Sequence, residues 1–163
     1  MSALVIDSSA ALSWCFEDEA SPGSDTLFEQ VRDHGALVPG LWYLEVANVL
    51  LQAEKRGRIT TADVAMRLEL ISELPITTDN ETTTRAWREI LALARVEGLT
   101  TYDATYLELA IRRGLPLMTK DAALISAAGA KRRRDCRLTS DRVGQPARAV
   151  VAKARARWEK VTW

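Results

Sequence analysis

Short β-prone runs alternate along this chain with longer segments whose apolar residues recur at helical spacing. The runs are typical of short strands buried in a sheet, and they lie at residues 3–6, 36–38, 76–78 and 115–119. Helices are predicted between and after them, at residues 10–16, 24–34, 41–56, 60–74, 82–97, 104–113 and following Asp121. This alternation predicts an α/β fold with a parallel sheet covered by helices on both faces.

Glycine and proline residues mark the ends of most of these predicted elements. Gly57, Gly98 and Gly114 follow helical segments, and Pro75 stops another. At the start of the chain, Ser8 and Ser9 offer hydroxyls that could cap the first helix. Three tryptophans within the predicted helices are expected to pack in the core or at an interface, namely Trp14, Trp42 and Trp87.

The character of the chain changes after Gly129. A basic run, Lys131 to Arg134, begins a segment in which no core-forming strand is evident. We therefore expect one domain over residues 1–130 and a C-terminal basic extension over residues 131–163 that is disordered or partly helical.

Composition places the chain among globular proteins outside the membrane. Apolar residues make up 47% and charged residues 27%, and no apolar run approaches the roughly 20 residues of a membrane span. The N-terminus has no basic region and only a short apolar run, so we expect no signal peptide and a cytoplasmic location.

A net charge of zero hides a division between the two parts of the chain. Residues 1–130 contain 11 Lys and Arg against 19 Asp and Glu, whereas residues 131–163 contain 11 against 3. An acidic body repels the phosphate backbone of a nucleic acid unless cations are gathered locally. A nucleic-acid function must therefore be argued from a particular site.

Four carboxylates stand where such a fold could gather them. Asp7 follows the first strand and Asp121 follows the last, and the carboxyl ends of parallel strands meet at one edge of a sheet. Glu45 and Asp103 lie near the starts of two predicted helices. Carboxylate oxygens suit Mg²⁺ or Mn²⁺, so the chemistry that these residues best support is metal-assisted hydrolysis of a phosphodiester.

Each carboxylate also has a purely structural interpretation. Asp103 and Asp121 could cap helices or favour their first turns, although Thr100, Thr101 and Thr119 offer competing caps. Glu45 could lie on the solvated stripe of its helix. Asp7 differs, because a carboxylate directly at the end of a buried strand loses hydration unless it binds something.

Four segments in this order resemble the PIN-domain ribonucleases, and most of all the VapC-type toxins of bacterial toxin–antitoxin pairs. They are spaced over residues 1–128 and are Leu4-Val5-Ile6-Asp7-Ser8-Ser9, Val38-Pro39 with Leu44-Glu45-Val46-Ala47-Asn48-Val49-Leu50, Thr101-Tyr102-Asp103-Ala104, and Leu115-Pro116-Leu117-Met118-Thr119-Lys120-Asp121.

The resemblance implies a three-layer α/β/α domain with a short central parallel sheet. It further implies a Mg²⁺- or Mn²⁺-dependent endoribonuclease that forms a homodimer and is inhibited by a cognate antitoxin protein. The implied metal ligands are chiefly Asp7 and Asp103, completed by Glu45 and Asp121, with the hydroxyls of Ser8 and Thr119 beside them.

Two other interpretations stay open from the sequence. The acidic pocket with Thr119-Lys120 beside it also suits a receiver-type signalling module phosphorylated on an aspartate, although receivers carry adjacent acids after the first strand and Ser8 and Ser9 stand here. The second is a PIN fold that binds without cutting. This interpretation is open because the basic run at residues 131–134 stands where the family has its last short strand, at the edge of the sheet.

Overall fold

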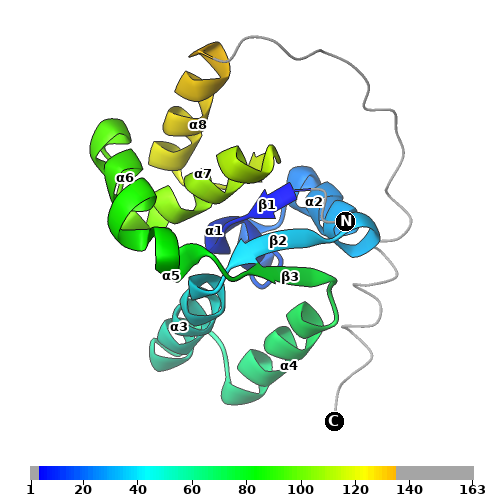
Figure 1. The fold of residues 1–163 in the computed structure, drawn as a ribbon. Helices are drawn as coiled ribbons and strands as arrows, with labels where there is room; N and C mark the ends of the chain where they lie inside the picture. Colours follow the sequence, from blue (N-terminus) through cyan, green and yellow to red (C-terminus); the bar gives the residue numbers. More distant parts are fainter. Residues whose placement is uncertain (1–3, 135–163) are drawn as a thin grey trace.

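The computed structural model describes residues 4–134 (Figure 1). Its strands are β1 (Leu4–Ile6), β2 (Ala36–Pro39), β3 (Ile76–Asp79) and β4 (Leu117–Met118). The helices that precede β3 are α1 (Ser8–Leu12), η1 (Glu17–Glu19), α2 (Pro22–His34), α3 (Leu41–Lys55) and α4 (Thr61–Ser72). Those that follow it are α5 (Thr82–Arg85), η2 (Ala86–Ile90), α6 (Leu91–Glu97), α7 (Thr101–Arg113) and α8 (Ala122–Arg134).

The four strands form one parallel sheet in the order β3-β2-β1-β4. In the register, Ile6 pairs with Met118, and Pro39 pairs with Asp79. The carboxyl ends of all four strands therefore lie at one edge. Asp7 directly follows β1 there, and Thr119 follows β4 beside it.

Helices cover the sheet on both sides and give the predicted three-layer α/β/α arrangement. Helix α7 packs against β1, β2 and β4, while α3 packs against α1 and α4. Figure 1 shows α6, α7 and α8 on one side of the strands and α3 and α4 on the other. Val5, Ile6 and Val38 in the central strands are fully buried. None of the described helices is both long and apolar enough to cross a bilayer.

Several predicted elements differ in extent. Helix α1 ends at Leu12, and its cap is the Asp7 side chain, so the prediction that Ser8 or Ser9 caps it was wrong. The segment predicted as one helix over residues 82–97 contains a π-helical turn, η2. Trp87 in that turn is 90% exposed, so it does not pack in the core, and its placement at an interface stays a prediction. A π turn rotates the side chains that follow it relative to an α-helix, which alters the face that each one presents.

The C-terminal elements differ as well. Strand β4 is confined to Leu117–Met118, shorter than the predicted residues 115–119. Helix α8 continues to Arg134, so the first residues of the basic extension belong to this helix. The rest of the predicted extension, residues 135–163, lies outside the described residues.

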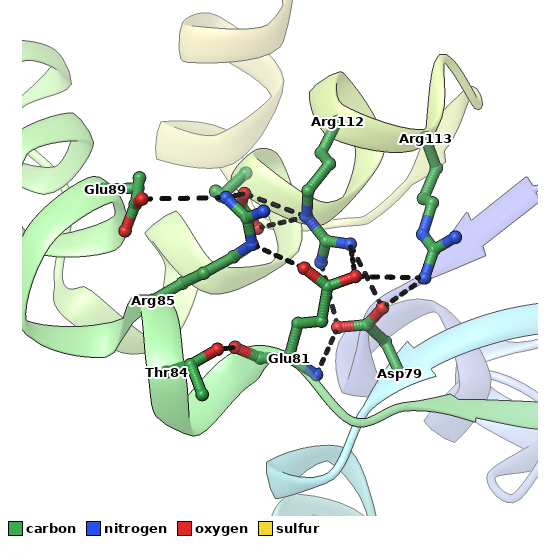
Figure 2. Close-up of polar contacts among 8 residues, drawn as sticks. Asp79, Glu81, Thr84, Arg85, Glu89, Arg112 and Arg113 are labelled. Atoms are coloured by element: carbon green, nitrogen blue, oxygen red, sulfur yellow. Dashed lines mark hydrogen bonds and ion pairs between the residues drawn. The ribbon is translucent and has the colours of Figure 1, made fainter.

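A network of ion pairs joins the end of α7 to the edge strand β3 (Figure 2). The guanidinium of Arg112 lies 2.9 Å from the Asp79 carboxylate, 3.1 Å from Glu81 and 3.0 Å from Glu108. Arg113 adds a contact of 2.8 Å to the other oxygen of Asp79. The network fixes α7 against the turn that follows β3.

Asp79 is the most buried member of the network, with 1% of its side chain exposed. Burial alone would raise the pKa of Asp79, but hydrogen bonds from Arg112 and Arg113 outweigh it and hold the pKa below its ordinary value. Because the folded pKa is depressed, the stability that this carboxylate contributes is present at neutral pH and is lost as the pH falls through the folded pKa.

We expect Arg112→Met to lower the free energy of unfolding by about 3 kcal/mol, because removing one partner leaves a buried carboxylate short of donors. Urea unfolding at neutral pH measures the change. The matched control is Arg32→Met, whose pair with Asp33 is exposed to solvent and should contribute little to stability. Equal losses in the two variants would contradict a special role for the buried network.

Candidate active site

Asp7 occupies the transition from a buried strand to a helix. Its backbone ends β1, and one of its carboxylate oxygens accepts a hydrogen bond of 2.9 Å from the amide of Ala10, which caps α1. The residue is only 5% exposed. A short acidic side chain is favoured at this position because it satisfies an amide that the first turn of the helix leaves free.

Hydroxyl groups from two segments complete the surroundings of Asp7. Thr119, directly after β4, donates a hydrogen bond of 2.6 Å to Oδ2 of Asp7. The Ser9 hydroxyl lies 2.8 Å and 2.9 Å from the two carboxylate oxygens and accepts a bond from the amide of Lys120. Neutral donors therefore join the ends of β1 and β4 around one carboxylate.

Burial raises the pKa of Asp7 above its ordinary value, even though the bonds from Thr119, Ala10 and Ser9 act in the opposite direction. The negative charge of Asp121 raises this pKa further. The charged carboxylate of Asp7 has therefore lost part of its hydration, as its position after a buried strand predicted.

Glu45 projects from the second turn of α3 toward α7. The hydroxyl of Tyr106, a residue of α7 that is 2% exposed, donates a hydrogen bond to Oε2 of Glu45. Burial raises the pKa of Glu45, whereas the hydroxyls of Tyr106 and Ser8 lower it. Asp7 and Asp103 raise it through charge repulsion. Glu45 is thus linked to both helix α7 and the end of β1.

The other two predicted acids take part in helix starts. Asp103 lies in the first turn of α7, where its amide is capped by Thr100 and its carboxylate accepts a 2.6 Å bond from the same hydroxyl. Asp121 accepts a 2.8 Å bond from the amide of Leu124 at the start of α8. Both therefore have the capping-region roles that the sequence allowed. Those contacts leave further oxygen lone pairs on each carboxylate.

Charge repulsion links Glu45 with Asp7 and Asp103, and links Asp7 with Asp121. Among the side chains described, those of residues 4–129, each Arg or Lys ion pair involves other acids, and Asp7, Glu45, Asp103 and Asp121 take part in none. In the same part of the chain, no three His, Cys, Asp or Glu side chains are grouped closely enough to hold a metal ion by themselves.

A divalent cation nevertheless fits the chemistry of this donor set. Mg²⁺ usually binds through one or two carboxylates, keeps several waters and takes further oxygens from a substrate phosphate. A preformed cage of three protein ligands is therefore not required. The desolvated Asp7 carboxylate and its acidic neighbours would be relieved of mutual repulsion by such an ion.

Sequence reasoning missed two residues of this arrangement. Ser9 was considered only as a helix cap, yet it bridges Asp7 and the amide of Lys120. Tyr106 lies 61 positions from Glu45, and nothing in the sequence spacing relates the two residues. The predicted hydroxyls are both present, since Thr119 contacts Asp7 and Ser8 lies beside Glu45. The predicted metal ligands stay a prediction.

We expect Asp7→Asn to raise the free energy of unfolding at neutral pH when divalent ions are absent. Folding raises the pKa of Asp7, so its contribution to stability is full below the unfolded pKa and is lost as the pH rises through the folded pKa. The amide keeps the cap and carries no charge. Urea unfolding at neutral and acidic pH measures the difference, which should shrink in acid. A less stable variant at neutral pH would contradict this account.

We expect Tyr106→Phe to raise the pKa of Glu45 further, because the variant loses a hydrogen bond that favours the charged carboxylate while burial persists. Glu45 should then stay protonated to a higher pH, which ¹³C NMR titration of its carboxyl carbon measures. Tyr43→Phe is the control, since it removes a hydroxyl that bonds Thr78 instead of Glu45. An equal Glu45 pKa in both variants would contradict the link.

Comparison with known proteins places this geometry in a family. The family model for the PIN domain matches residues 4–130. Ribonuclease VapC3 from Pyrobaculum aerophilum is 30% identical over 121 residues, which cover 74% of this chain and 91% of that protein. The crystal structure of PAE2754 from the same organism has a similar fold, with a TM-score of 0.59 and 23% identity over 82% of this chain and 88% of that one. These matches confirm the resemblance drawn from the sequence, and the chain belongs to the PIN-domain family.

Proposed function

We propose that this protein is a metal-dependent endoribonuclease and the toxin of a toxin–antitoxin pair. The observation that carries the proposal is the buried carboxylate of Asp7 at the ends of β1 and β4. This carboxylate accepts a hydrogen bond from Thr119 and lies close enough to Glu45 for charge repulsion, and it has no cationic partner among the described side chains. Similarity to Ribonuclease VapC3 supports RNA as the substrate.

Asp7 and Asp103 would be the principal ligands of Mg²⁺ or Mn²⁺, with Glu45 and Asp121 completing its coordination directly or through water. When bound, the cation would polarise the phosphoryl oxygen and activate the attacking water. The protein's own groups position these ligands: Thr119 and Ser9 orient Asp7, and Tyr106 and Ser8 orient Glu45.

The proposed role also implies partners. A cognate antitoxin protein would block the site, and the active form would be a homodimer, as the resemblance to VapC-type toxins indicates. We expect the protein to act on RNA in the cytoplasm.

The structure does not favour phosphorylation of an aspartate as the function. The ammonium group of Lys120 donates a 3.1 Å hydrogen bond to the carbonyl of Glu19 instead of contacting Asp7. The experiments below distinguish the proposed nuclease from a PIN fold that binds without cutting RNA.

We expect Asp7→Asn to abolish both Mg²⁺-dependent cleavage of a pool of structured RNAs and growth arrest in cells, while the protein stays folded by circular dichroism. The control, Asp33→Asn, makes the same chemical change at an exposed acid that is paired with Arg32. This control should cut RNA like the unaltered protein, and EDTA should stop cleavage by both of these proteins.

Calorimetric titration of Mn²⁺ into the same proteins gives a readout that does not depend on cleavage. The unaltered protein and Asp33→Asn should bind the ion, and Asp7→Asn should bind it at least about tenfold more weakly. Undiminished RNA cleavage by Asp7→Asn would refute the proposed site. Tight antitoxin binding by an unaltered protein that never cuts RNA would identify a binding-only PIN fold.

A further inference from the structure

A cavity of about 240 Å³ opens along α3 one helical turn beyond Glu45. Its lining includes Asn48, Gln52 and Arg56 from α3 and its C-cap, and Phe16 and Arg58 from neighbouring segments. None of these residues belongs to the acidic site described above.

The cavity continues the same stripe of α3 that carries Glu45. Residues 45, 48, 52 and 56 follow one another at intervals of three or four, so they lie on one side of the helix. At 1.5 Å per residue, Arg56 lies about 16 Å along the axis from Glu45. An extended strand held at the acidic site could therefore run along this stripe into the cavity.

The two arginines of the cavity differ in their contacts. The Arg58 guanidinium lies 3.9 Å from the ring centre of Phe16 and pairs with Asp18 at 2.6 Å and Glu19 at 3.5 Å. Arg58 is thus fixed as part of the wall. Arg56 is exposed and forms no ion pair with any side chain in the range 4–129. One guanidinium is therefore free to meet a ligand.

The lining is mostly apolar, with Val49 and Ala53 also in the wall, and its polar side chains are suited to a nucleotide. The amides of Asn48 and Gln52 each offer paired donor and acceptor groups, which match the edges of bases. The free guanidinium of Arg56 matches a phosphate. Since residues 1–130 carry an excess of acids, a local cation is what a nucleic-acid strand would need there.

We propose that this cavity is a subsite for single-stranded RNA, in which Gln52 and Asn48 contact a base and Arg56 contacts a backbone phosphate farther along the strand from the cleavage position. The proposal rests on the proposed ribonuclease function and adds the residues that select the sequence. Base contacts specify a site, whereas phosphate contacts position the strand.

Binding is tested in full-length protein carrying Asp7→Asn, without divalent ions, by fluorescence anisotropy with a labelled single-stranded RNA of mixed sequence. Adding Arg56→Gln should weaken binding several-fold and reduce the slope of log affinity against log salt by about 0.7, the loss of one phosphate contact. Lys55→Gln is the matched control, because it removes the same charge from a neighbouring exposed residue that does not line the cavity.

Base selection is tested in the cleaving protein by sequencing the products of a mixed RNA pool. Gln52→Leu should relax the preference at one nucleotide position at a fixed distance from the cut by about fivefold or more. Arg56→Gln should slow cleavage of all sequences alike. If no RNA is cut by the unaltered protein, the proposed function fails, whereas the anisotropy comparison still tests the cavity.

Two results would overturn the subsite. The first is equal RNA affinity and salt slope for Arg56→Gln and Lys55→Gln. The second is a cleavage pattern that Gln52→Leu leaves unchanged. If Arg56→Gln instead weakens capture of the cognate antitoxin and leaves RNA affinity equal to the control, the cavity is a protein-binding site and the RNA assignment is wrong.

Discussion

Burial of the Asp7 carboxylate at the end of β1 is the constraint around which this end of the sheet is organised. A strand buried on both faces delivers the side chain to a position that water reaches poorly, so its oxygens need donors from the protein. Those donors are the amide of Ala10 and the hydroxyls of Ser9 and Thr119. All of them are neutral. The carboxylate therefore keeps its charge uncompensated and its affinity for a cation.

The buried acids of this protein have two different kinds of environment. Asp79, at the end of the edge strand, is held by Arg112 and Arg113, and its pKa is lowered. Asp7 and Glu45 have raised pKa values because burial, together with repulsion from neighbouring acids, exceeds the effect of their hydrogen bonds. A satisfied carboxylate stabilises the fold, whereas a strained cluster of like charges is characteristic of a functional site. The difference supports assigning Asp79 to structure and Asp7 to chemistry.

The parts of the structure that depend on local sequence were predictable. Strand β1, helix α3 and the placement of Asp7 follow from apolar runs, helical spacing and the position of one acid. Long-range pairings were not predictable, because Arg112 lies 33 residues from Asp79 and nothing in the spacing relates them. The hydrogen bond from Tyr106 to Glu45 was not predictable for the same reason, because it depends on tertiary packing. This also holds for the π-helical turn that contains the exposed Trp87.

Helix α3 is the element that would relate cutting to recognition. Its second turn carries Glu45, which Tyr106 ties to α7, and its last turns carry the side chains of the proposed RNA subsite. A site on a rigid helix holds its groups at fixed separations better than a site on loops. If α3 supplies both a ligand at the cleavage position and contacts to the strand beyond it, the distance from the recognised base to the cut is set by helical rise. Sequence selection would then follow from the fold instead of from a separate binding domain.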